Sequence, residues 1–371
     1  MSDTALVIGG TGPTGPHVVN GLLERGYQVS ILHSGRHESE LIPPSVTHLH
    51  TDAFDSAQVA DTVGSQTFDL VVSMYGRLRD LARFFEGRCG RFVSVGGAPV
   101  YRGFGWPEAN TPVGMLLPTH EEDALAGPGD NPKVLKMIET EQTLFHHHPG
   151  ATHLRYPRLY GPGQVQPKEW SVVRRLLDGR RRIIVADGGL TITVLAYTRN
   201  AAHALLCAID QPEAAAGRIF NVTDERSVTI AQWIELLAAG LGREVEVVSM
   251  PWSLARPARP LGEASAHHRM LSAEALRRDL GYRDVVPVEQ ALPDAARWLA
   301  DHPLERGSVT EAGLGDPFDY DTEDRLLDAW NGALEQLQPI ADTANADWVD
   351  RYAHTSVNVH LGIDSARRAS G

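Results

Sequence analysis

A glycine-rich stretch near the start of the sequence constrains the fold more than any other feature. In ALVIGGTGPTGPHVV, residues Ala5 to Val19, four glycines follow directly behind an apolar run. A strand, a glycine loop and a helix in this order place a pyrophosphate against backbone N–H groups, because the missing side chains allow a tight turn and a close approach. We therefore predict a dinucleotide-binding loop made of Gly9, Gly10, Thr11, Gly12, Pro13, Thr14 and Gly15.

The rest of the first half alternates between short apolar runs and amphipathic stretches. The predicted strands are Ala5–Ile8, Gln28–Leu32, Val46–His50, Leu70–Met74 and Phe92–Val95, and the predicted helices are Thr14–Arg25, Ser56–Val63 and Lys133–His146. Such alternation is typical of βαβ units with right-handed crossovers. We predict an α/β fold with a doubly wound parallel sheet of the Rossmann type in residues 1–162.

Two further regions are expected after this sheet. Residues 163–303 are predicted to form a smaller α/β substrate domain with segments that return to the first sheet, and residues 304–371 a C-terminal extension. In the extension, DPFDYDTEDRLLDAWNGALEQL has its large apolar residues near helical spacing and predicts a packed helix. The later stretch WVDRYAHTSVNVHLGID is a candidate for an added strand or a dimer contact.

Composition excludes several classes of protein. The chain has 34 Lys and Arg against 47 Asp and Glu, a net charge of −13, which disfavours nucleic acid as a partner. No apolar run approaches the roughly 18 residues of a membrane-spanning helix, and no signal-type segment stands at the N-terminus, so we expect a cytoplasmic protein. The consecutive His146, His147 and His148 would point in different directions on a helix, so we predict no metal site.

The residues after the second predicted strand bear on the choice between NAD and NADP. NAD-preferring sites carry a carboxylate there for the ribose hydroxyls, which would repel a 2′-phosphate. In LHSGRHE, the position is taken by His33, Ser34 and Arg36. We therefore expect NADP, with NAD still possible. Asp52 is a candidate partner for the adenine amino group, and a helix N-cap is its alternative role.

Several short motifs carry a resemblance to a known superfamily. In chain order they are GGTGPTG, VSVGGAPVYRG, LRYPRLYGPG, FNVTDERSVTIAQW and LRRDLGYRD. Over most of residues 4–300 the sequence resembles the extended short-chain dehydrogenase/reductase superfamily, which includes nucleotide-sugar epimerases and dehydratases. The resemblance implies an NAD(P)-dependent enzyme that acts on a small molecule and forms a homodimer.

The catalytic pair of that superfamily is missing here. The resemblance implies a Tyr-x-x-x-Lys pair, whose tyrosine exchanges a proton with the substrate oxygen. The matching segment is NPKVLKMIETEQTLF. A register set on Glu141 puts Lys133 at the tyrosine position and Met137 at the lysine position. A register set on Lys136 puts Pro132 at the tyrosine position, so neither register restores the pair.

Other residues are therefore candidates for the proton transfer. Lys133 comes first, because a partly buried lysine releases its proton more readily and isoflavone-reductase-like members use a lysine in a comparable role. Tyr101 and Tyr156 are expected to face the cleft from strand ends, with packing as the alternative. The usual hydroxyl position falls at Gly97, which leaves Ser94 as the nearby hydroxyl of the cofactor site.

Three functions fit these residues. The first is an NAD(P)-dependent oxidoreductase, either a reductase or an epimerase/dehydratase-like enzyme, acting on a small oxygenated or aromatic substrate with a non-standard acid/base residue. The second is a non-catalytic NAD(P)-binding sensor or regulatory protein. The third, an RNA-associated protein, is disfavoured by the net charge of −13.

Overall fold

A computed structural model describes residues 2–36, 38–261 and 266–344 of the chain. The chain divides into two compact units, Met1–Phe318 and Asp319–Gly371. The stretch WVDRYAHTSVNVHLGID, predicted to add a strand or a dimer contact, lies outside the described residues. Within the described part of the chain, no helix is both long enough and apolar enough to cross a membrane.

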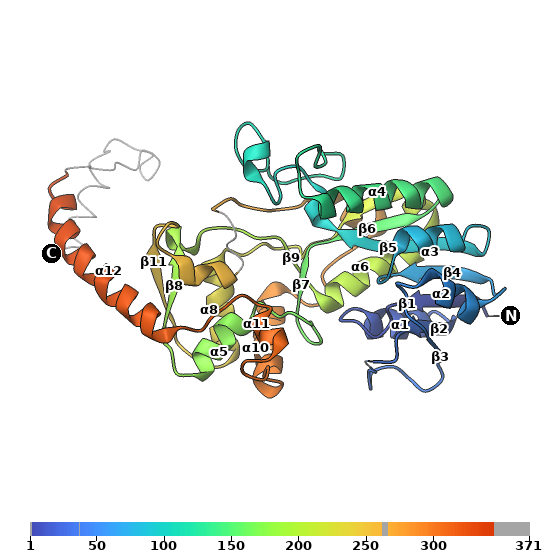
Figure 1. Ribbon diagram of the computed structural model, residues 1–371, viewed down its shortest axis with the longest axis horizontal. Helices are drawn as coiled ribbons and strands as arrows, with labels where there is room; N and C mark the ends of the chain where they lie inside the picture. Colours follow the sequence, from blue (N-terminus) through green and yellow to red (C-terminus); the bar gives the residue numbers. More distant parts are fainter. Residues whose placement is uncertain (1, 37, 262–265, 345–371) are drawn as a thin grey trace, which may run out of the picture. The chain divides into compact units, whose positions relative to one another are not determined.

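The first unit is built on a parallel sheet of seven strands (Figure 1). Its order across the sheet is β10, β6, β5, β4, β1, β2, β3, and every neighbouring pair is parallel. The strands are β1 (Thr4–Ile8), β2 (Gln28–His33), β3 (Thr47–His50), β4 (Phe68–Ser73), β5 (Cys89–Gly97), β6 (Thr152–Tyr156) and β10 (Arg218–Asn221). This order confirms the predicted doubly wound α/β fold.

Helices cover both faces of the sheet, and the side-chain alternation of β1 shows why. Ala5 and Val7 pack in one cluster with α1 (Gly15–Glu24) and α6 (Thr198–Asp210). Leu6 and Ile8 point to the other face, toward α2 (Ser56–Val63), α3 (Leu78–Phe84) and α4 (Pro132–His147). Successive strand residues face opposite sides, so an apolar run such as TALVI is buried on both.

The remainder of the first unit is built from shorter elements. Two small parallel pairs form here, β8 (Arg182–Ala186) with β11 (Glu246–Met250) and β7 (Arg158–Tyr160) with β9 (Leu195–Tyr197). The helices around them are α5 (Trp170–Leu177), α7 (Pro212–Ala215), α8 (Ile230–Gly240), α9 (Glu274–Leu280), α10 (Val288–Asp301) and α11 (Val309–Ala312). Short 3-10 turns lie at Ala98–Val100, Pro107–Ala109, Asp187–Gly189 and Arg256–Leu261.

The predicted domain boundaries differ from the two compact units. Strand β10 lies in the large sheet and comes from residues 163–303, the region whose segments were expected to return to this sheet. Residues 304–318 belong to the first unit, where Asp316 forms an ion pair of 2.6 Å with Arg175 of α5. The second unit contains α12 (Tyr320–Ala341), where the sequence predicts a helix. The division into a substrate domain and an extension stays a prediction.

Candidate functional site

The glycine loop joins the C-terminal end of β1 to α1 at the middle of the sheet. From β1 the chain builds outward to β2 and β3, and then returns to β4 on the other side of β1. Ligands of doubly wound sheets bind outside the carboxyl ends of the strands at such a reversal of strand order. The loop therefore lies at the position where this type of fold binds a dinucleotide.

The loop glycines are required by close backbone approaches. A Cβ on Gly15 would lie 2.2 Å from the carbonyl oxygen of Gly10, and a Cβ on Gly10 would lie 2.7 Å from Cγ2 of Ile31. Gly9 has φ +93°, in the region that favours glycine. A Cβ on Gly12 meets only the carbonyl oxygen of Gly9, at 3.5 Å. Gly12 is therefore the one of these four that the fold does not itself demand.

The first turn of α1 fits an anion. Thr14 occupies the N-cap, and its side chain makes no capping hydrogen bond; its hydroxyl lies 3.6 Å from Sδ of Met74 instead. Unsatisfied N–H groups and the helix dipole favour negative charge at such an end. The absence of a side chain at Gly12 and the uncapped first turn of α1 together make this loop suitable for binding a pyrophosphate.

The residues after β2 lie differently from the expectation. His33 is 5% exposed, and burial lowers its pKa while Glu38 acts in the opposite direction. Its Nε2 lies 3.1 Å from Nδ1 of His48, so this ring nitrogen faces another histidine. Ser34 and Arg36 are exposed beyond it. His33 is thus buried against other histidines, and its part in cofactor binding stays a prediction.

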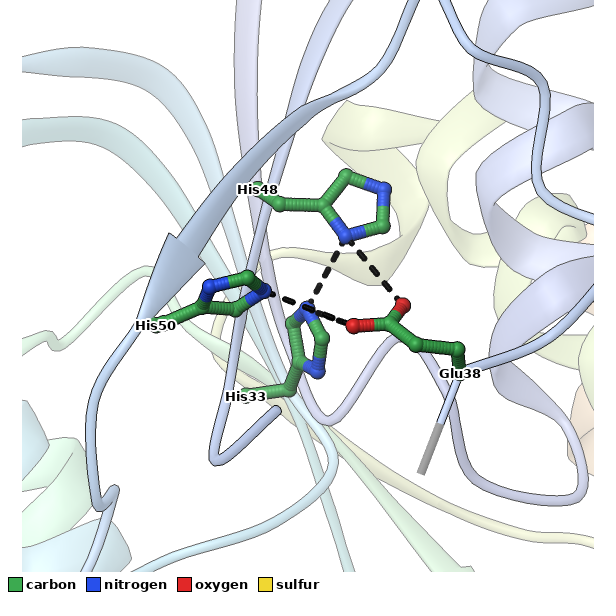
Figure 2. A group of neighbouring side chains, drawn as sticks. All are labelled: His33, Glu38, His48 and His50. Atoms are coloured by element: carbon green, nitrogen blue, oxygen red, sulfur yellow. Dashed lines mark hydrogen bonds and ion pairs between the residues drawn. The ribbon is translucent and has the colours of Figure 1, made fainter. Parts of the chain in front are cut away.

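A cluster of possible metal ligands forms at this edge of the sheet. His33, Glu38, His48 and His50 each bring one ligand atom to within 4.8 Å of the others (Figure 2). This cluster differs from the prediction of no metal site, which rested on the consecutive His146, His147 and His148. The alternation of His48 and His50 in THLH was the available signal, since residues two apart in a strand share a face.

The segments that follow β3 and β4 contain residues that sequence reasoning missed. Asp52 is exposed and accepts a hydrogen bond from the backbone N–H of Phe54 at 2.9 Å. The N-cap of α2 is Asp55 and not Asp52, so the alternative role considered for Asp52 is wrong. Phe54 and Tyr75 are exposed and meet edge to face with ring centroids 5.0 Å apart. Exposed aromatic rings beside the loop offer a stacking surface for a base.

Helix α4 carries the segment in which the resemblance implies the catalytic pair. A Cβ on Gly97 would lie 2.6 Å from Cε of Met137, so Met137 packs directly against the end of β5. Lys133 is exposed in the first turn of α4, where its backbone N–H donates to the Asn131 cap. The burial expected for Lys133 is therefore not found. A cleft of about 320 Å³ lies between α4, β5 and the β4–α3 connection.

Below this cleft, a buried ion pair fixes α4 to the sheet. Glu141 accepts two hydrogen bonds from Arg155 of β6, at 2.9 and 2.8 Å. Burial acts to raise the pKa of Glu141, but the hydrogen bonds from Arg155 and His153 outweigh it and lower the pKa to about 2. Ser94 is fully buried with its hydroxyl 2.7 Å from Nδ1 of His153, which holds it inside the sheet.

The two candidate tyrosines already have protein partners for their hydroxyl groups. Tyr101 donates to Asn221 at 2.6 Å and accepts from Arg155 at 2.7 Å, and burial raises its pKa to about 12. Tyr156 is buried in the core and donates to the carbonyl oxygen of Ala201 at 2.7 Å. Neither hydroxyl faces the cleft, because each satisfies a buried polar group instead.

Comparison with known sequences gives distant relatives. No protein-family model matches the chain. The 3-diazoavenalumate denitrifying reductase of a Streptomyces species is 27% identical over 254 residues, covering 64% of this chain and 81% of the relative. The uncharacterised protein YbjS of Escherichia coli is 25% identical, covering 32% and 42%. A 3β-hydroxysteroid dehydrogenase/decarboxylase of Arabidopsis thaliana is 23% identical, covering 42% and 32%.

Solved structures match the fold over most of the chain. The Bordetella bronchiseptica enzyme WbmH, in complex with NAD⁺, has a TM-score of 0.64 at 17% identity and covers 81% of this chain and 100% of its own. The UDP-glucose 4-epimerase of Thermotoga maritima has a TM-score of 0.64 at 18% identity, with coverages of 81% and 99%. The predicted resemblance is thus confirmed for the fold, which is that of the NAD-dependent epimerases and dehydratases.

Proposed function

We propose that this protein is an NAD(P)H-dependent reductase that works without a Tyr-x-x-x-Lys pair. The observation that carries the proposal is the glycine loop at the reversal of strand order, with Gly12 bare and the first turn of α1 uncapped. When bound, a reduced nicotinamide cofactor supplies a hydride to the substrate. The glycine loop and the N-terminus of α1 hold its pyrophosphate, while Phe54 and Tyr75 offer a surface for its adenine.

NADP is the cofactor we propose over NAD. Ser34 and Arg36 are exposed at the end of β2, where a guanidinium can bind a 2′-phosphate with charge-assisted hydrogen bonds. Of the two glutamates on this connection, Glu38 and Glu40, Glu38 faces the histidines, 3.4 Å from both His48 and His50. Part of its negative charge is therefore engaged within the cluster.

For the proton, we propose Lys133 as the donor when the substrate requires one. In the register set on Glu141, Lys133 takes the tyrosine position at the start of α4, and its exposure leaves the ammonium group free to meet a substrate. Reduction of a carbonyl produces an oxyanion that must be protonated, whereas a substrate that already carries positive charge accepts a hydride without a proton donor. The curated relative named a 3-diazoavenalumate denitrifying reductase makes small aromatic electrophiles a reasonable substrate class to test.

The experiment compares two sets of substrates in the wild-type protein and in Lys133→Met. Consumption of NADPH is followed by the absorbance of the reduced ring, with neutral aldehydes and ketones as one set and cationic aromatic electrophiles as the other. We expect Lys133→Met to lower turnover of the carbonyl set by about 10²–10⁴ and to leave the cationic set unchanged. Lys133→Arg should not rescue the carbonyl set, because guanidinium keeps its proton.

Two outcomes would contradict the proposal. Saturable binding of NADPH without turnover of either set would indicate the non-catalytic sensor. Full carbonyl activity in Lys133→Met would remove Lys133 from the mechanism while leaving the reductase in place. Lys136→Met, which alters an exposed lysine one turn further along α4, is the matched control. The homodimer and the cytoplasmic location stay predictions.

A further inference from the structure

Four side chains converge on one face at the edge of the large sheet. Strand β3 is the edge strand, and its parallel register with β2 pairs His33 with His50. Cross-strand partners share a face, and His48 and His50 share a face because they are two residues apart. The connection from β2 to β3 adds Glu38 to the same face. Figure 2 shows three imidazole rings and a carboxylate directed toward one point.

The ligand atoms lie close enough together to share one ion, all within 4.8 Å of one another. Ligands bound at 2.0–2.1 Å in a tetrahedron lie roughly 3.3 Å from one another. Nε2 of His33 is 3.1 Å from Nδ1 of His48, which is 3.4 Å from Oε2 of Glu38. Oε1 of Glu38 is 3.4 Å from Nε2 of His50 and 3.9 Å from Nε2 of His33. Small movements of the side chains would equalise these distances around one ion.

The cluster combines one buried side chain, His33, with three side chains that solvent can reach. The side chain of His33 is 4% exposed, that of His48 28%, and those of Glu38 and His50 53% and 58%. The rings meet edge to face, with centroids 4.8 to 5.9 Å apart, and not in stacks. This arrangement aims ring nitrogens at a shared centre and leaves an ion a path from solvent.

We propose that His33, Glu38, His48 and His50 bind one divalent transition-metal ion of the zinc class. Three imidazoles and one carboxylate form a donor set that suits Zn²⁺, whereas Ca²⁺ and Mg²⁺ prefer shells made of oxygen ligands. Four protein ligands leave no open position, so the ion has a structural role. It ties the edge strand β3 to β2 and to the connection between them. The proposal is independent of the cofactor and of any activity.

The competing explanation is a cluster of histidines held together by hydrogen bonds. The backbone N–H of Gly35 lies 3.3 Å from Nδ1 of His33, which places the ring proton on Nε2, facing His48. When an ion binds Nε2, the ring proton moves to Nδ1, which can then no longer accept the hydrogen bond from Gly35. Both arrangements use the same four side chains, so direct binding of metal distinguishes them.

The test uses Zn²⁺ itself, titrated calorimetrically into the untagged, chelator-treated full chain. We expect one tight site per chain, at least tenfold weaker in His48→Ala and in His50→Ala. These side chains are partly exposed on an edge strand, which makes folded variants attainable. His147→Ala is the matched control, because His147 also pairs with a glutamate, Glu86, at 2.9 Å. Zn²⁺ should raise the thermal midpoint of the wild type and of His147→Ala, but not of His50→Ala.

Co²⁺ provides a second readout, because a tetrahedral site gives Co²⁺ intense visible absorption. We expect that spectrum in the wild type, its loss in Glu38→Gln combined with His50→Ala, and its retention in His147→Ala. A stoichiometry well below one ion per chain would overturn the proposal. So would Zn²⁺ affinity that is unchanged in His48→Ala and His50→Ala, or lost in His147→Ala.

Discussion

Replacing Glu141 by alanine should destabilise the fold far more than the same change at Glu139. Both residues lie on α4, and both pair with an arginine at 2.8 Å. The pair of Glu141 with Arg155 is buried, with side-chain exposures of 7% and 2%, whereas Glu139 and Arg79 are 58% and 32% exposed. Water screens the exposed pair and cannot replace the lost carboxylate in the buried one.

The magnitude follows from two independent arguments. Breaking a buried ion pair leaves an uncompensated charge and costs about 3–5 kcal/mol, against about 1 kcal/mol or less for an exposed pair. The pKa of Glu141 falls from 4.5 to about 2, a difference that corresponds to about 3 kcal/mol of stability. Because the folded pKa is depressed, this stability is present above the unfolded pKa and is lost as pH falls from 4.5 through 2.

Equilibrium urea unfolding, followed by far-ultraviolet circular dichroism, measures both effects. The loss in Glu141→Ala should exceed that in Glu139→Ala by about 2–4 kcal/mol at neutral pH, and the difference should shrink as the pH approaches 2. A double-mutant cycle with Arg155→Met isolates the interaction between the two side chains. Equal losses in the two glutamate variants, or a difference independent of pH, would refute the reasoning.

Three further changes test other parts of the structure. Arg36→Ala should weaken NADPH binding by about 1–3 kcal/mol and leave NADH binding unchanged, and equal losses by calorimetry would count against the 2′-phosphate contact. Gly12→Ala should keep the wild-type urea midpoint but weaken NADPH about tenfold, or ~1.4 kcal/mol, whereas Gly15→Ala should lower the midpoint because its Cβ meets the Gly10 carbonyl at 2.2 Å. A chain ending after residue 303 should lose about 3–5 kcal/mol relative to one ending after residue 318, since it lacks the Asp316 partner of Arg175; similar stability of the two would contradict this.

The fold was predictable from the sequence because its signals are local. The run TALVI is buried on both faces of the sheet, and apolar runs interrupted by helical patterns predict parallel strands. The sequence did not predict helix α3, because its seven residues, LRDLARF, are too few to show a helical pattern of apolar residues. The sequence did not specify which strand β10 pairs with, because its partner, β6, lies more than sixty residues earlier.

The sequence predicted only the part of the site that is formed by one continuous segment. The glycine loop is continuous in sequence, and the strand before it and the helix after it are the context by which such a loop is recognised. The histidine cluster depends on the register of β2 with β3, which aligns His33 with His50 and which residue spacing does not reveal. The burial of Tyr101 and Tyr156 likewise depends on Asn221 and Ala201, partners that come from distant elements.

Calorimetric titration of NADPH into the wild-type protein tests the central claim most directly. The glycine loop at the centre of the sheet predicts one saturable site per chain, with weaker binding of NADH and weaker binding of NADPH by Gly12→Ala. Binding that is unchanged in Gly12→Ala would place the cofactor elsewhere. No saturable binding of either NADPH or NADH by the folded wild-type chain would contradict the account.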